Sequence, residues 1–228
     1  MEELNQKTIG QYFSLLSQKA PVEWERLPDI GLYMDQVITY LERQLEIFRK
    51  PGGDSLITPS MINNYAKAKI VPRTEGKKYG QEHIALLMAV FTLKRVLSVQ
   101  DMASLFGGSG GAGKAKEFYE QFRKSMERAI GETATTVRSG ILAAIDGEEA
   151  GERSSGASAP PDGGQGVDRG ALRGLALELA VEASMRGFAA ELLLSVADPE
   201  NPGLGGKVKA PAPKEGKARK KGDKKTSD

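Results

Sequence analysis

Apolar residues recur along this chain at intervals of three and four positions, the spacing that is typical of amphipathic helices. The clearest run spans residues 32–48, where Met34, Val37, Leu41 and Leu45 share one face. Similar spacing predicts helices over residues 8–18, 81–96, 98–106, 116–130 and 171–197, with residues 133–145 continuing the fourth of these. The pattern therefore predicts a mainly α-helical protein.

A shorter helix over residues 59–69 is predicted by its boundary signals. Thr58 is a favourable N-cap, and Pro59 is favourable at the first helical position because it lacks an amide hydrogen that would stay unpaired there. Pro72 closes the segment, and a minimal β-hairpin containing Gly76 is predicted over residues 72–79. Within this short helix Ile62 is expected to face inward, while polar side chains face outward.

The outward face of residues 59–69 is rich in hydrogen-bonding groups, which favours contact with the major groove of DNA. Because an amide side chain can bond an adenine edge, Asn63 and Asn64 are the predicted base-reading residues. Phosphate contacts are predicted for the cationic residues and for the Tyr65 hydroxyl. The full predicted set is Thr58, Ser60, Asn63, Asn64, Tyr65, Lys67, Arg73, Lys77, Lys78 and Tyr79. For Tyr79 a place in the core is an equal alternative, and for the whole face the alternative is an ordinary solvated helix.

The same residues resemble a known family. Thr58, Tyr65, the exit Ile70-Val71-Pro72 and the turn Gly76-Lys77-Lys78-Tyr79 are similar to the recognition helix and wing of MerR-type winged helix-turn-helix regulators. With the upstream run 32–37, residues 27–106 more specifically resemble a bacterial family of unknown function, number 1836, regarded as MerR-like. The resemblance implies a winged helix-turn-helix fold and DNA binding. The chain departs from the MerR pattern in having Asn63 where an arginine is common, and in its short wing.

The formal net charge of +2 conceals a basic tail. From Lys207 onward the chain carries nine basic and three acidic residues, so residues 1–206 are acidic overall. DNA attraction in the folded part must therefore come from a local patch. The tail resembles those of chromosome-associated proteins, which bind DNA without sequence preference, and a solubilising role is the equal alternative.

Several kinds of chemistry are not expected. The chain has no cysteine, which excludes disulfides and thiolate metal sites, and its one histidine, His83, has no partner suited to a metal site or a catalytic triad. Residues 108–114 superficially match a phosphate-binding loop, but Ala115 stands where a hydroxyl residue is required. We therefore expect no catalytic site, no cofactor and no metal, and a non-enzymatic protein whose effector, if it has one, is unknown.

Composition divides the chain into seven segments. We expect an N-terminal helix within residues 1–26, a DNA-binding domain over 27–106, a glycine-rich linker at 107–115, an amphipathic helix at 116–145, a disordered linker at 146–170, a helix at 171–197 and a disordered basic tail at 198–228. No run is long and apolar enough to span a membrane, and the N-terminus has no secretory pattern, which predicts a soluble cytoplasmic protein.

The apolar stripe of residues 172–196 must be covered, either by the 116–130 helix or by a second copy of the chain. A homodimer is attractive because two-fold proteins read two half-sites on double-stranded DNA. The sequence thus predicts a dimeric transcription regulator. The alternatives are a helical protein-interaction or scaffold module and a chromosome-associated protein that binds DNA through its tail.

Overall fold

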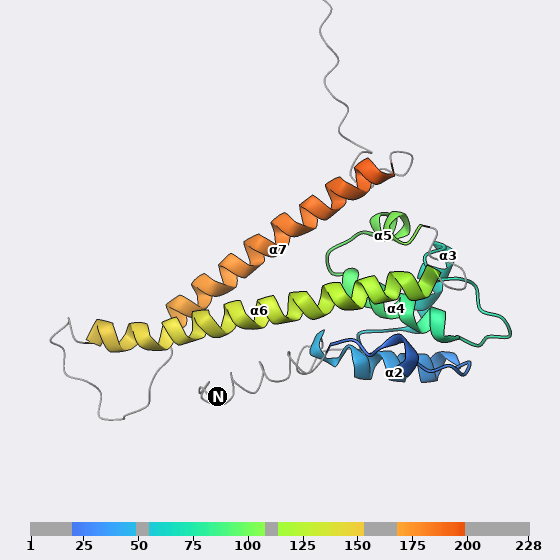
Figure 1. Cartoon of the computed structure of the whole chain (residues 1–228), viewed down its shortest axis with the longest axis horizontal. Helices are drawn as coiled ribbons and strands as arrows, with labels where there is room; N and C mark the ends of the chain where they lie inside the picture. Colours follow the sequence, from blue (N-terminus) through green and yellow to red (C-terminus); the bar gives the residue numbers. More distant parts are fainter. Residues whose placement is uncertain (1–19, 49–54, 108–113, 153–167, 199–228) are drawn as a thin grey trace, which may run out of the picture.

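The computed structural model describes residues 20–48, 55–107, 114–152 and 168–198, and the part it describes is mainly α-helical (Figure 1). The elements are the 3-10 helices η1 (Trp24–Arg26) and η2 (Glu46–Phe48) and the α-helices α2 (Met34–Gln44), α3 (Pro59–Lys67), α4 (Gln81–Leu93), α5 (Val99–Leu105), α6 (Lys114–Glu152) and α7 (Arg169–Ala197). The helix predicted over residues 8–18 and the tail after residue 198 lie outside the described residues.

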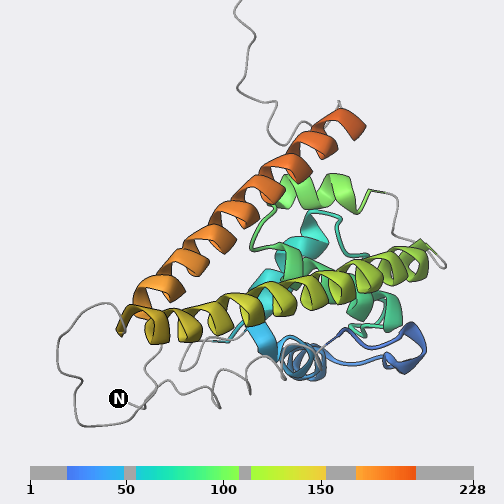
Figure 2. The same cartoon turned by 60° about the vertical axis from the view of Figure 1, so that its left-hand side comes forward.

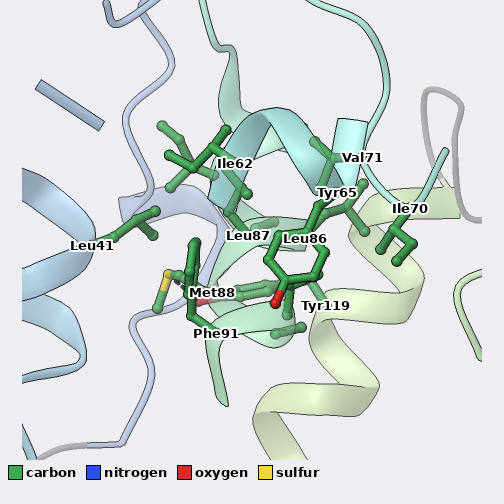
Figure 3. Close-up of a cluster of buried hydrophobic side chains, with 14 of the residues drawn as sticks. Leu41, Ile62, Tyr65, Ile70, Val71, Leu86, Leu87, Met88, Phe91 and Tyr119 are labelled. Carbon is green, nitrogen blue, oxygen red and sulfur yellow. Dashed lines mark hydrogen bonds between the residues drawn. The ribbon is translucent and has the colours of Figure 1, made fainter. Parts of the chain in front are cut away.

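Helix α4 is the centre of the core, because it is apolar on every side. All eight residues from 84 to 91 are buried, and α4 packs against both α2 and α6. Its buried side chains are surrounded by core side chains from α2, α3 and α6 and from the residues just after α3 (Figure 3). A helix without a polar face is stable only when it is enclosed in this way.

Helix α2 encloses one side of α4 through Val37 and Leu41, which are both fully buried. At its start the Tyr33 amide donates to the Gln36 side chain over 2.9 Å. Sequence periodicity predicts a helix over residues 32–48, but α2 ends at Gln44 and the chain tightens into η2. Helix ends commonly tighten in this way, because a 3-10 turn satisfies carbonyls that the α-helix leaves free.

Helix α6 begins within the same core, although a glycine-rich stretch separates it from α5 in sequence. Ala115 and Tyr119 are fully buried, and the Tyr119 hydroxyl donates to the Val22 carbonyl over 2.8 Å. The Trp24 ring meets Tyr119 edge-on at 6.0 Å between centroids. Burial raises the pKa of Tyr119, so its phenol stays neutral. The core thus extends beyond the predicted boundaries of 27 and 106 at both ends.

Helix α6 is also longer than predicted. It runs without a break through Gly131 to Glu152, so residues 146–152 of the predicted disordered linker are helical. An isolated glycine costs a helix only about 1 kcal/mol, and alanine and glutamate around residues 148–150 are good helix formers. The rest of that linker, residues 153–167, lies outside the described part.

Helix α7 packs on its own chain along one face. In both views α6 and α7 converge where α6 ends and diverge toward α5 (Figures 1 and 2). At the close end Gly140 lies under Leu175, where an added Cβ would come within 2.6 Å of a Leu175 methyl carbon. At the open end Gly187 is buried, and a Cβ there would lie 3.0 Å from Val96. Two glycines therefore allow α7 to approach its neighbours.

In place of the β-hairpin predicted over residues 72–79, the structure has one isolated antiparallel bridge between Glu75 and Lys78. A second isolated bridge joins Tyr79 to Leu32, and the described residues contain no β-strand. No helix in the described part of the chain is long and apolar enough to cross a membrane.

We expect Tyr119→Phe to lower the free energy of unfolding by about 0.5–1.5 kcal/mol, because it removes one hydrogen bond and leaves the half-buried Val22 carbonyl without that donor. Tyr33→Phe, at an exposed ring, is the matched control and should change stability by much less. Urea unfolding of the three proteins measures the difference. Equal stability of all three would show that the Tyr119 bond contributes nothing.

Candidate nucleic-acid interface

Helix α3 begins at a well-formed cap. Thr58 has extended backbone angles, and its hydroxyl accepts a hydrogen bond from the Met61 amide over 3.3 Å, while Pro59 occupies the first turn. Because its hydroxyl is used in this way and its side chain is half-buried, Thr58 is placed to hold the helix start. Its contact with DNA stays a prediction.

The end of α3 is closed by a pair of backbone hydrogen bonds. The Ile70 amide donates to the Tyr65 carbonyl over 3.0 Å, and the Lys69 amide donates to the Ala66 carbonyl over 3.2 Å. This pairing is a Schellman motif, which requires a left-handed residue at the position of Lys69. Lys69 has φ of 60° there, where glycine is the favoured residue. The lysine therefore carries backbone strain that a glycine would avoid.

The inner face of α3 is held by Ile62 and Tyr65 (Figure 3). Ile62 is fully buried, and the Tyr65 ring is only 8% exposed and meets Phe91 of α4 edge-on at 5.8 Å. Burial also raises the pKa of Tyr65. Sequence reasoning assigned Tyr65 to a phosphate contact. The structure places the ring of Tyr65 in the core against α4, and the contact of its hydroxyl with a phosphate stays a prediction.

The outer face of α3 presents a polar stripe made of Ser60, Asn63, Asn64 and Lys67. All four are exposed, and their spacing of three, four and seven residues from Ser60 places them on one side of the helix. The structure thus brings together four of the five predicted contacts on this helix, all except Tyr65. Because Ile62 and Tyr65 anchor the opposite side, the stripe has a fixed orientation toward solvent.

Lys94, which sequence reasoning overlooked, contacts the segment that precedes α3. Its ammonium donates to the Leu56 carbonyl over 2.8 Å and lies 4.8 Å from the centroid of the Phe91 ring. Partial burial lowers the pKa of Lys94, with a smaller contribution from neighbouring Arg95. Its position after an apolar helix offered no sequence signal for this long-range contact.

The predicted wing is a tight two-residue turn. Gly76 and Lys77 both have left-handed backbones, with φ of 58° and 60°, and the Lys78 amide donates to the Glu75 carbonyl over 3.2 Å. Two consecutive positive φ values define a type I′ turn, which favours glycine or asparagine at both positions. Lys77 is therefore the second strained lysine of this region, and Lys77, Lys78 and Arg73 are all exposed.

The base of the turn is fastened to the rest of the domain by Tyr79. Its amide and carbonyl pair with those of Leu32 over 2.8 and 2.9 Å, and its ring is only 7% exposed and lies edge-on to His83 at 5.7 Å. Of the two roles open to Tyr79, the structure favours the core. His83 accepts a hydrogen bond from the Gly80 amide through Nδ1, which fits a structural histidine.

Charge is concentrated on this surface. Residues 59–80 contain five basic residues and one acidic residue, while the remainder of residues 1–206 holds 18 basic and 26 acidic ones. The five are Lys67, Lys69, Arg73, Lys77 and Lys78. Within the described part of the chain none of them forms an ion pair, so their charge faces solvent. Lys78 lies 5.7 Å from the centroid of the Tyr33 ring.

The connection to α3 differs from that of a standard helix-turn-helix motif. Residues 45–58 separate α2 from α3, whereas that motif joins its two helices by a turn of about three or four residues.

The described residues hold no group of three or more His, Asp or Glu side chains arranged to bind a metal. Most of the segment similar to a phosphate-binding loop, residues 108–113, lies outside the described part.

Residues 22–122 match the family model described as domain of unknown function (DUF1836). No curated protein and no solved structure matches the chain. The matched span begins at Val22 and ends at Phe122, and Val22 is the residue whose carbonyl accepts the Tyr119 hydrogen bond. The limits of the match therefore coincide with the core around α4 rather than with the predicted boundaries at 27 and 106.

We expect Lys69→Gly and Lys77→Gly each to raise the free energy of unfolding by up to about 1 kcal/mol. A left-handed residue other than glycine costs about 1–2 kcal/mol, which exceeds the roughly 0.5–1 kcal/mol of extra backbone entropy that glycine loses. Lys124→Gly, at an exposed lysine inside α6, is the matched control and should lower stability by about 1 kcal/mol. Chemical denaturation measures all three, and a loss of stability in Lys69→Gly and Lys77→Gly would contradict the assigned strain.

Proposed function

We propose that the domain around α4 binds double-stranded DNA in a sequence-specific way and that the chain is a cytoplasmic transcription regulator. In this proposal α3 enters the major groove and the turn at residues 72–79 contacts the adjacent phosphates, as in a MerR-like winged helix. The observation that carries the proposal is the surface itself. A capped helix shows a stripe of hydrogen-bonding side chains, and two strained lysines, Lys69 and Lys77, lie at its exit and in the turn after it.

The strain supports an electrostatic role. Glycine is the less costly residue at both left-handed positions, and a lysine there adds positive charge at the expense of stability. Backbone strain of this kind is concentrated at functional sites. Five exposed cations within residues 59–80, none in an ion pair within the described part of the chain, favour a polyanionic ligand. DNA is such a ligand, with regularly spaced phosphates beside base edges.

The division of labour follows from the chemistry of each side chain. Asn63 and Asn64 offer an amide that can donate to and accept from one adenine edge, so they are the proposed base readers. Ser60 and Lys67 extend the same stripe, while Arg73, Lys77 and Lys78 supply charge for phosphates. Tyr65 and Tyr79 are packed in the core, where they hold α3 and the turn in place.

A second candidate function is a helical protein-interaction module, and the observation that favours it is the exposed apolar side of α7. A third, binding of DNA through the basic tail without sequence preference, rests on residues outside the described part. Binding to DNA from upstream of the chain's own gene at two salt concentrations separates the three. Selective retention at the higher salt supports the regulator, loss of all binding on removal of the tail supports the third, and no binding supports the second.

The specificity of α3 is tested by Asn63→Ala and Asn64→Ala. Each should weaken binding to the preferred site by about 1–3 kcal/mol while leaving random DNA nearly unaffected, because only base contacts carry sequence information. Gln121→Ala, at an exposed amide of α6, is the matched control. Titration of labelled duplexes gives the ratio of specific to random affinity, and an unchanged ratio in both asparagine variants would remove α3 as the reader.

The role of the turn is tested by replacing Lys77 and Lys78 together with glutamine, which keeps side-chain length. Affinity should fall by a similar factor for all sequences, and the slope of log affinity against log salt should flatten by about 0.9 per lost phosphate contact. Lys124→Gln with Arg128→Gln removes two exposed charges from α6 and should leave the slope unchanged. Both double variants are made in a chain ending at Gly206, so that the basic tail does not contribute to DNA affinity. A salt slope equal to that of the same chain without substitutions would exclude the turn from the interface.

A further inference from the structure

Helix α7 is apolar on two opposite sides, and the described part of the chain covers only one of them. The covered side includes Leu175, Gly187, Ala190 and Leu194, which lie against α6, Val96 and the core. The opposite side carries a row of large apolar side chains that are each more than half exposed. They are Leu177, Val181, Met185, Phe188, Leu192 and Val196. We name this row the outer stripe of α7.

The outer stripe has the extent of an interface. It runs from residue 177 to residue 196, which is a length of about 28 Å along a helix. At roughly 100 Å² of exposed apolar surface for each half-exposed large side chain, the six residues offer roughly 600 Å². A specific interface buries about 800 Å² on each partner. An exposed apolar patch of this extent is typical of an interaction surface, so the outer stripe points to a partner.

The spacing of the outer stripe is the same in both directions along the helix. Successive members are separated by four, four, three, four and four residues. When two copies run antiparallel about a two-fold axis between residues 186 and 187, each member therefore meets another member. Leu177 meets Val196, Val181 meets Leu192, and Met185 meets Phe188 of the second copy. An interface that presents the same patch on both subunits requires this self-complementarity.

The charges beside the outer stripe are compatible with this pairing. Glu182 and Glu191 come to the same height along the antiparallel seam, but on a helix of 3.6 residues per turn they lie on opposite flanks of the stripe and do not meet. Glu182 is also paired with Arg186 of its own helix over 3.3 Å. Glu178 is aligned with Val196, five turns away, and comes to the height of Ser195 of the second copy. The seam is thus apolar along its centre, carries one carboxylate near each end, and brings none of these acidic side chains against another.

We propose that two copies of this chain dimerise through the outer stripes of their α7 helices, packed antiparallel. The inference rests on α7 alone and does not depend on DNA binding. If the DNA-binding proposal also holds, the dimer carries two copies of α3 related by a two-fold axis, which predicts an operator with two inverted half-sites.

The association is tested on the full chain without DNA. Light scattering at micromolar concentration should give twice the chain mass of 24.5 kDa. Leu192→Glu should give the single-chain mass, because it places a charge in the apolar seam. Leu142→Glu, at a leucine of α6 with the same exposure of 51%, should remain dimeric. A monomeric wild type overturns the proposal, as does a Leu192→Glu variant that stays dimeric; a monomeric Leu142→Glu variant moves the interface to α6. Circular dichroism verifies that both variants are folded.

The orientation is tested by cysteine pairing, because the natural chain contains no cysteine. Val181→Cys and Leu192→Cys variants are mixed under mild oxidation. Antiparallel packing should yield a disulfide between the two different variants and little product from either variant alone. In that arrangement two copies of residue 181 lie about 16 Å apart along the axis, beyond the reach of a disulfide. Efficient linking of each variant to itself would show parallel packing and overturn the antiparallel arrangement.

Discussion

Eight consecutive residues of α4, from 84 to 91, are buried, and a helix with no polar side is stable only when its neighbours enclose it. The neighbouring helices of the domain each cover a different side of α4. Helix α2 supplies Val37 and Leu41, α3 supplies Ile62 and Tyr65, and α6 supplies Ala115 and Tyr119. At about 1.5–3 kcal/mol for each large apolar side chain removed from water, this enclosure is the main favourable term in the domain.

The enclosure of α4 also determines what faces solvent. Because Tyr65 is packed edge-on against Phe91, the opposite side of α3 must point away from the core, and that side holds the polar stripe. The adjoining turn is tied down by the two Tyr79–Leu32 hydrogen bonds. A surface on rigid supports loses little conformational entropy on binding, which is consistent with the specific DNA contact that we propose for it.

The two long helices extend this arrangement away from the core. Helix α6 joins the core through its first turns, and α7 leaves the far end of α6 and returns toward α5 (Figure 1), with Gly140 allowing close approach to Leu175 and Gly187 to Val96. The polar stripe of α3 and the outer stripe of α7 are therefore parts of one folded unit. Their chemistries differ, since the first offers charge and hydrogen bonds and the second offers apolar area. This difference is why we propose DNA as the ligand of the first stripe and a second copy of the chain as the partner of the second.

Local signals in the sequence were sufficient for the helices themselves. The cap at Thr58 and Pro59, the periodicity of residues 32–48 and the apolar run of α4 all predicted elements that the structure contains, within a few residues at each end. These signals act between residues near in the chain, so they can be read without knowing the fold. The outward position of Ser60, Asn63, Asn64 and Lys67 followed from helical spacing for the same reason.

Contacts between residues far apart in the chain were decided only by the tertiary structure. The sequence did not show that Tyr119 joins Val22, that Lys94 reaches Leu56, or that Tyr65 and Tyr79 are used in the core. Nor did it show which side of α7 stays exposed, because both sides are apolar and only packing distinguishes them. Apolar periodicity indicates that one side of a helix must be covered. Which segment covers it depends on the tertiary fold, because that segment can be distant in sequence.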